Sequence, residues 1–197
     1  MTLPEDASDQ VLTARAVKGE QAAFGILMGR HKGWLYRFVR RYVTDGEEAY
    51  DVLQESFASA WTALSRYDPE RPFEVWLRRI ALNKCRDRAR KAAVRRVLFG
   101  FAGAAEHRPE VADPSPGADS AAASRQALAR LEAAVASLPR GLKEPLVLTA
   151  LEGLSHKEAG EILGMNAKAV ETRVYRARKA LAAVLERSDL DDLSGDR

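Results

Sequence analysis

Basic side chains gather in one short stretch of the chain, and their chemistry is that of phosphate binding. Residues 78–96 contain nine Arg or Lys and a single acid, Asp87, so the local net charge is +8. Guanidinium and ammonium groups at this density attract polyanions such as nucleic acid. The ordinary alternative for such a stretch is a solvated helix face that needs no partner.

A second basic set follows a pattern typical of a helix-turn-helix. Ser155 and Glu158 have the spacing of a capping box, which predicts a short helix from there through Leu163. Gly164 suits the end of that helix, because glycine readily takes the left-handed conformation found there. The turn 164–166 then leads into a longer helix.

The longer helix is predicted to have one apolar and one basic face. Its apolar stripe consists of Val170, Val174, Ala177, Leu181 and Val184. Its outward face carries Lys168, Arg173, Arg176, Arg178 and Lys179, with Glu171 as the only acid. A short helix, a tight turn and a second helix with a basic face suit reading of the DNA major groove. A plain helical hairpin with a solvated surface is the alternative.

The sequence contains no motif that predicts covalent chemistry. It has no Gly-rich phosphate loop, no nucleophile elbow and no HExxH-like pair. The histidines His31, His107 and His156 have no metal-binding spacing, and the single cysteine, Cys85, excludes an internal disulfide or a multi-cysteine zinc site. Cys85 is either an inert thiol or a redox sensor. We therefore expect a protein that is not an enzyme and holds no cofactor and no metal.

The elements that position these groups are predicted to be helices. Asp45 and Glu48 have capping-box spacing at the start of a helix over 45–65, whose core-facing stripe is Leu53, Phe57, Ala60 and Leu64. Another helix is predicted to begin near Pro72, with the stripe Phe73, Trp76, Leu77 and Ile80. Phe24, Leu27, Leu35, Phe38, Val39 and Tyr42 indicate one or two earlier helices. No strand pattern appears, so the predicted fold class is all-α.

The length allows one large domain or two small ones, and the stretch from Gly100 to Ala123, rich in Gly, Ala, Pro, Ser and acidic residues and without an apolar period, divides the chain in two. The chain has 197 residues, 46% of them hydrophobic and 30% charged, with a net charge of +3, which is ordinary for a soluble globular protein. We predict a helical domain over 1–96, a flexible linker over 97–124, and a helix-turn-helix domain over 125–197 with a short acidic tail. No apolar run approaches the ~20 residues of a spanning helix, and the N-terminus is acidic, so we expect a cytoplasmic protein.

The predicted linker has a net charge of −3, from Arg108 and the acids Glu106, Glu110, Asp113 and Asp119. Two interpretations remain open. Either the acids mimic a phosphate backbone, with 97–101 as an apolar anchor, or they belong to a solvated tether.

The motifs together resemble the extracytoplasmic-function (ECF) sigma factors, the smallest members of the sigma-70 family. Leu138 to Leu181 resembles their region 4. Asp51 to Trp61 resembles the polymerase-binding helix of region 2, and Arg66 to Lys91 resembles its promoter-melting and −10 reading segment. The resemblance covers about residues 10–91 and 126–186, in the family's order. At 166–169 the chain departs from the family pattern, which leaves the −35 sequence preference open.

The resemblance implies a subunit that brings core RNA polymerase to a promoter and opens the DNA, usually under the control of an anti-sigma factor. The implied contacts with core polymerase are Asp51, Gln54, Glu55 and Thr62. Those with −10 DNA are Tyr67, Arg78, Arg79, Asn83, Lys84, Arg86, Arg88, Arg90 and Lys91. Those with −35 DNA are Lys168, Glu171, Thr172, Arg173, Tyr175, Arg176, Arg178 and Lys179.

Individual roles follow from side-chain chemistry. The amide of Asn83 is expected to pair with the edges of exposed bases, and the ring of Tyr67 is near enough to a strand-capture loop over 68–72 to stack on a base. Phe73 and Trp76 are expected in the core, as are Phe57 and Trp61.

A second function class stays open. Region 4 also resembles the output domains of helix-turn-helix regulators that act without being polymerase subunits. Such a protein needs a ligand-binding or receiver domain, and the N-terminal half shows neither an α/β receiver pattern nor an apolar ligand cup. This favours the sigma factor.

Overall fold

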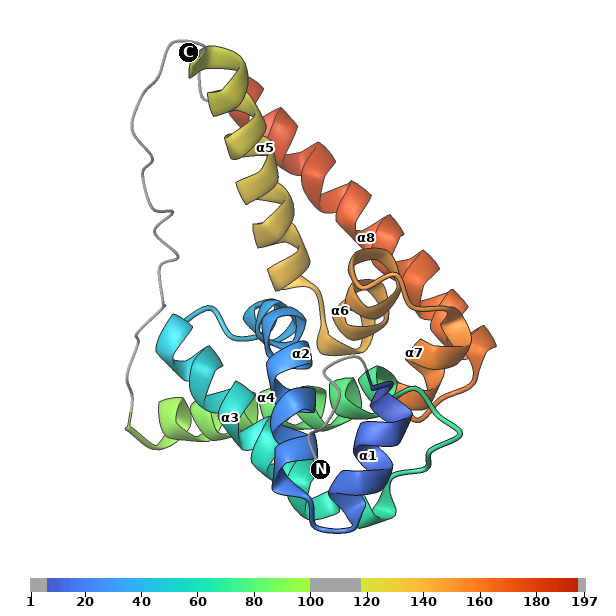
Figure 1. The fold of residues 1–197 in the computed structure, drawn as a ribbon. Helices are drawn as coiled ribbons and strands as arrows, with labels where there is room; N and C mark the ends of the chain where they lie inside the picture. The colour runs from blue at the N-terminus through green and yellow to red at the C-terminus, as the bar shows by residue number, and fades with distance from the viewer. Residues whose placement is uncertain (1–6, 100–117, 195–197) are drawn as a thin grey trace. The chain divides into compact units, whose positions relative to one another are not determined.

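The protein is all-α, as predicted, in a computed structural model that describes two stretches of the chain. The backbone is described for residues 7–99 and 118–194, and the side chains for 7–95 and 125–186. Within these ranges every regular element is a helix. The chain divides into two compact units, Met1–Ala105 and Glu106–Arg197, which are coloured from blue to green and from yellow to red in Figure 1.

Unit 1 begins with two helices joined by a tight turn. Helix α1 (Asp9–Val17) is capped by the Ser8 hydroxyl, which accepts a hydrogen bond from the Val11 N–H. Gly19 has φ of +90° in the turn, a conformation that costs glycine little. Helix α2 (Gln21–Arg40) then runs without a break, so the predicted "one or two" helices are one. Helix α1 was not predicted from the sequence.

The second pair of helices completes the core of unit 1. Helix α3 (Gly46–Ala63) begins at Asp45, whose carboxylate accepts a hydrogen bond from the Glu48 N–H at 2.8 Å. A 3₁₀ turn, η1 (Leu64–Arg66), and a loop lead to α4 (Phe73–Phe99). The predicted stripe of α3 is buried throughout, as are Phe73 and Leu77 of α4. Trp61 is half-buried, and its ring centroid lies 5.0 Å from that of Phe24 on α2.

Helix α4 leaves the core halfway along its length. Leu82 and Cys85 are its last buried hydrophobic residues among the described side chains, and residues 89–95 are all exposed. The change follows the sequence, because the apolar stripe stops where the basic stretch takes over. Cys85 is buried in this core.

Unit 2 begins with a long helix followed by a broken one. Helix α5 (Ala118–Ser137) lies against α8 (Figure 1). Helix α6 (Arg140–Leu146) contains Pro145 and passes directly into a π-helical turn, η2 (Val147–Leu151). Leu146, Val147 and Leu148 are buried and form the centre of this unit's core.

The predicted helix-turn-helix is present in unit 2. Helix α7 (His156–Leu163) starts with the full capping box of Ser155 and Glu158 and ends at Gly164, whose φ is +71°. Helix α8 (Ala167–Ser194) follows, and the Asn166 side chain accepts a hydrogen bond from the Ala169 N–H at 2.8 Å. Val170, Val174 and Ala177 are buried against the rest of the unit.

The helices extend into both ends of the predicted linker. Helix α4 reaches Phe99 and α5 begins at Ala118. The predicted linker over 97–124 therefore includes the end of α4 and the start of α5. The anchor over 97–101 and the four linker acids lie outside the described side chains. In the part of the chain that the structure describes, none of the helices is both long and apolar enough to cross a membrane.

Candidate nucleic-acid and protein interfaces

Helix α8 presents an exposed polar face opposite its buried stripe. The face consists of Lys168, Glu171, Thr172, Arg173, Tyr175, Arg176, Arg178 and Lys179, all of which are exposed. Tyr175 is 69% exposed, so its ring is open to a binding partner. Every residue predicted to meet −35 DNA therefore lies on the surface of the second helix of the helix-turn-helix.

Lys168 and Glu171, at the start of this face, form an ion pair. The Lys168 Nζ lies 2.9 Å from a carboxylate oxygen of Glu171, and the same contact lowers the pKa of Glu171 through the hydrogen bond and the charge of Lys168. The Thr172 hydroxyl donates to the Lys168 carbonyl oxygen at 2.9 Å. Lys168 thus contributes a partly neutralised charge, whereas the guanidinium groups of Arg173 and Arg176 extend from the helix two turns in from its start.

The predicted −10 contacts on α4 fall into three environments. Arg79, Asn83, Arg90 and Lys91 are exposed, and Lys84 and Arg86 are half-buried. The Asn83 side-chain oxygen accepts a hydrogen bond from Arg86 Nη1 at 3.1 Å, which leaves the amide NH₂ of Asn83 directed away from that contact. Arg90 forms an ion pair with Asp87 one turn earlier.

Arg88 is bound to helix α3. Its Nη2 lies 3.3 Å from Glu48 Oε1 and 3.7 Å from Asp51 Oδ2. The hydrogen bond to Glu48 raises the pKa of Arg88, and the charges of Asp51 and Glu55 act in the same direction. Arg88 is therefore directed toward the acidic face of α3, which the sequence analysis assigned to a different partner.

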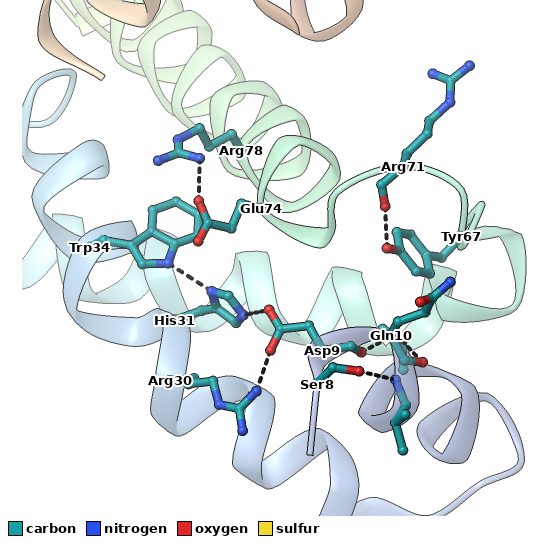
Figure 2. Close-up of polar contacts among 12 residues, drawn as sticks. Ser8, Asp9, Gln10, Arg30, His31, Trp34, Tyr67, Arg71, Glu74 and Arg78 are labelled. Atoms are coloured by element: carbon teal, nitrogen blue, oxygen red, sulfur yellow. Dashed lines mark hydrogen bonds and ion pairs between the residues drawn. The ribbon is translucent and has the colours of Figure 1, made fainter. Parts of the chain in front are cut away.

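Arg78 is buried, contrary to what a phosphate contact requires. Only 7% of the residue is exposed, and its guanidinium carbon lies 4.2 Å from the centroid of the Trp34 ring. Its Nη1 also lies 3.1 Å from a carboxylate oxygen of Glu74 (Figure 2). The Glu74 partner lies one turn earlier on α4, but Trp34 comes from α2, so the local sequence of α4 carried no signal that Arg78 packs on an aromatic ring. We correct its assignment from a DNA contact to a structural residue.

The loop between η1 and α4 is organised around Tyr67. The Tyr67 hydroxyl donates to the Arg71 carbonyl oxygen at 2.5 Å, and its ring centroid lies 5.7 Å from that of Phe73 and 5.2 Å from that of Trp76. Burial raises the pKa of Tyr67, as do the charges of Asp9 and Asp68. The half-buried ring is thus part of an aromatic cluster, and one side of it remains at the surface.

The outer face of α3 is acidic and exposed. Asp51, Gln54, Glu55 and Thr62 all lie on it, and the Thr62 hydroxyl donates back to the Ala58 carbonyl oxygen at 3.0 Å. An open depression of about 360 Å³ adjoins Thr62 and is lined also by Ala58, Ser59, Ala63 and Arg66. Carboxylates on an exposed helix face suit charge-assisted contacts with a basic partner helix.

One polar cluster of unit 1 was not predicted from the sequence. Asp9, Arg30, His31 and Trp34 lie together on α1 and α2 and reach Arg78 of α4 (Figure 2). His31 was considered only as a metal ligand, and its burial was not foreseen. Its place at a helix spacing of four from the buried Leu27 and Leu35 is the signal that was available.

Family models match both units. Residues 27–95 match sigma-70 region 2, and residues 128–181 match sigma-70 region 4. The matched ranges contain the α4 surface and the helix-turn-helix, respectively.

Relatives match over nearly the whole chain. The RNA polymerase sigma factor CnrH of Cupriavidus metallidurans is 44% identical over 185 residues, which are 93% of this chain and 96% of that protein. The ECF RNA polymerase sigma-E factor of Escherichia coli is 31% identical over 189 residues, covering 91% of this chain and 95% of that protein. A solved structure of CnrH in complex with the cytosolic domain of CnrY matches with a TM-score of 0.66 and 37% identity, over 92% of this chain and 99% of that one.

Proposed function

The chain belongs to the ECF group of the sigma-70 family and is an alternative RNA polymerase sigma factor, and on that premise we propose how its surfaces divide the work of initiation. The observation that carries the proposal is that three sets of exposed side chains lie on three different helices. They are the basic face of α8, the basic outer part of α4 and the acidic face of α3.

Helix α8 is the −35 reader in this proposal. Arginine forks pair with the major-groove edge of guanine, and the short polar and aromatic residues beside them meet the backbone or a thymine methyl group. Arg173 and Arg176 carry the recognition, and Thr172, Tyr175, Arg178 and Lys179 fix the helix on the phosphates. Lys168 and Glu171 act as a pair at the edge of the contact.

Helix α4 holds the −10 region and its opened strand. Arg79, Lys84, Arg86, Arg90 and Lys91 attract phosphates, and Asn83 meets an unpaired base. Tyr67 stacks from the side, because its ring is already fixed at the edge of the aromatic cluster. Arg88 is left out of this surface, since it is bound to two carboxylates of α3.

The acidic face of α3 docks on core RNA polymerase through Asp51, Gln54, Glu55 and Thr62. Arg88 holds Asp51 in place and partly neutralises it, so Glu55 and Gln54 supply the stronger contact. The chain acts as a dissociable subunit in the cytoplasm and carries out no covalent chemistry itself.

An anti-sigma factor is a further proposed partner. The support is that CnrH, a relative along nearly its full length, has been solved with the cytosolic domain of CnrY. A regulator of this kind would cover the α3 and α8 faces while the factor is inactive.

The test of the docking surface is charge neutralisation on α3. Asp51→Asn with Glu55→Gln is expected to weaken binding to purified core polymerase about tenfold while the melting temperature stays nearly constant, because exposed ion pairs contribute only about 0–1 kcal/mol. Glu132→Gln with Glu186→Gln in unit 2 is the matched control, since both are exposed and the change in net charge is the same. Equal core affinity of the two variants would remove the acids of α3 from the interface.

A further inference from the structure

The carboxylate of Asp9 joins the first helix of the chain to the second. One oxygen accepts a hydrogen bond from Arg30 Nη1 at 2.6 Å, and the other lies 2.7 Å from His31 Nε2. Asp9 is the first residue of α1, and both partners are on α2 (Figure 2). Two charge-assisted contacts at this length are among the stronger hydrogen bonds in proteins.

The hydrogen bonds of His31 fix its tautomer. The Trp34 indole N–H lies 2.8 Å from His31 Nδ1, and an indole nitrogen only donates. Nδ1 must therefore accept, so the ring proton is on Nε2 and is donated to Asp9. His31 is 3% exposed, and both of its nitrogens are satisfied within the protein.

Trp34 extends this chain of contacts to helix α4. The face of its indole ring receives the Arg78 guanidinium, which is in turn paired with Glu74 in the first turn of α4. A cation over the ring polarises the indole and strengthens its N–H as a donor. The chain of contacts thus runs from Asp9 on α1 through α2 to the start of α4.

The same residues lie against the loop that precedes α4. The His31 ring centroid is 5.2 Å from that of Phe73, and Phe73 in turn contacts Tyr67. The Gln10 side chain, next to Asp9, is 3.5 Å from the Pro69 carbonyl oxygen. The charge of Asp9 also contributes to the raised pKa of Tyr67, as its proximity requires.

We propose that Asp9, His31 and Trp34 are positioning residues for capture of the unpaired promoter strand. They set the loop over 67–72 and the rotation of the first turns of α4, and thereby aim Tyr67, Arg79 and Asn83. The inference rests on the proposed role of that loop and helix in binding −10 DNA.

The polar contacts are suited to orientation rather than to holding α1 in place. Leu12 and Ala16 of α1 are already buried within unit 1. Their hydrophobic stabilisation depends little on the exact orientation of α1. The buried ring of His31 has both nitrogens satisfied in one arrangement only, because a displaced nitrogen would lose its partner away from water. The arrangement that satisfies it is the one in which α4 and the loop have the positions described here.

The first test measures the loop directly. Hydrogen exchange of the backbone amides of 67–73 is recorded in the full chain for His31→Phe, which keeps a ring but removes both hydrogen bonds. We expect exchange there to rise about tenfold, with the amides of α3 unchanged. His31→Gln offers a donor to Asp9 and an acceptor to Trp34, and we expect it to restore most of the protection.

The second test measures strand capture. Holoenzyme is formed with core polymerase, and its affinity is measured for a single-stranded non-template oligonucleotide from a promoter selected by the wild-type holoenzyme. Trp34→Phe is expected to weaken this binding about fivefold, the size of one lost hydrogen bond, with closed-complex binding to duplex promoter unchanged. Trp61→Phe is the matched control, since Trp61 is also half-buried in unit 1 and packs on Phe24.

The outcomes distinguish the positioning role of Asp9, His31 and Trp34 from the proposed role of α4 in binding −10 DNA. Unchanged hydrogen exchange in His31→Phe would overturn the positioning role. Faster exchange with wild-type strand binding would also overturn it, because the contacts would then only stabilise the fold. If Asn83→Ala binds the oligonucleotide like wild type, the proposed −10 role fails, whatever the exchange experiment shows.

Discussion

In the proposed −35 surface of α8, Arg173 and Arg176 are expected to carry most of the recognition, and Arg-to-Lys exchange separates two ways in which they would act. Replacing either by Ala should cost about 1–3 kcal/mol of promoter binding if it forks onto a guanine. Lys keeps the charge and loses the fork, so it should rescue a phosphate contact and fail to rescue a guanine contact. Transcription from promoters with substituted −35 bases measures the difference.

The Ala variants of Arg173 and Arg176 also have an outcome that would exclude both residues from −35 recognition. If both Ala variants melt like wild type and transcribe −35-dependent promoters at the wild-type rate, another part of α8 reads the DNA. Both side chains are exposed on a helix whose packing depends on Val170, Val174 and Ala177, so loss of fold is not the expected cause of any defect.

Arg88 and Lys91 lie one turn apart on α4 and should respond differently to removal of their charge. Arg88 faces Glu48 and Asp51, whereas Lys91 is exposed on the part of α4 that leaves the core. Lys91→Ala should lower the salt dependence of DNA binding by about one phosphate, a change of roughly 0.7–0.9 in the log–log slope. Arg88→Ala should leave that slope unchanged.

The slope is measured from promoter affinity across a series of salt concentrations. A lower slope in Arg88→Ala would mean that the ion pairs to α3 open when DNA binds. Arg88 would then be one of the residues that bind −10 DNA, in spite of its ion pairs with Glu48 and Asp51 in the structure.

At the scale of the element, the helix-turn-helix depends on a close approach at Gly160. A Cβ at this position would lie 2.5 Å from the Met165 carbonyl oxygen, which belongs to the turn between α7 and α8. Gly160→Ala should therefore destabilise unit 2 by about 1–3 kcal/mol, as overpacking does. Gly141 of α6 has open space around the same atom, so Gly141→Ala should stabilise by about 0.5–1 kcal/mol.

Thermal denaturation of the full chain compares these two glycine variants. Opposite signs of the change in melting temperature support the close approach. A Gly160→Ala variant as stable as Gly141→Ala would show that the turn adjusts without cost, and the −35 surface would then tolerate movement of α7 against α8.

Local patterns predicted the elements that carry their own signals. Ser155, Glu158 and Gly164 mark the bounds of α7, and Asp45 marks the start of α3, because capping groups act within one turn. The α8 surface could be read in the same way, since its buried and exposed residues alternate with the helix period. These features depend on residues close in sequence.

What depends on distant residues could not be read. Arg78 is placed by Trp34 and Arg88 by Glu48, each some 40 positions away along the chain. The basic stretch therefore identified a helix of the correct charge, but it could not separate the arginines that face solvent from those that face the protein. Helix α1 carries local signals of its own, the Ser8 cap and Leu12 and Ala16 at a spacing of four, whereas the contacts of Asp9 depend on Arg30 and His31 of α2.

At the scale of the whole molecule, the chain is two units with different surfaces that serve one event. Unit 1 carries the acidic face of α3 and the basic α4, and unit 2 carries the helix-turn-helix. Eighteen residues, 100–117, connect the described parts, and at about 3.3–3.6 Å per residue they span at most ~65 Å. We propose that one subunit reads two DNA elements in a fixed order in this way, while core polymerase supplies the catalytic centre.

We propose that this chain gives core RNA polymerase a promoter preference through both units. The most direct measurement maps transcript 5′ ends from a random-sequence promoter library, with core polymerase alone and with the chain added. We predict new start sites that share two sequence elements at a fixed spacing, with Arg176→Ala relaxing the upstream element and Asn83→Ala the downstream one. If the chain instead adds no start sites and binds a duplex site tightly without polymerase, it acts as a free-standing helix-turn-helix regulator and not as a promoter-selecting subunit.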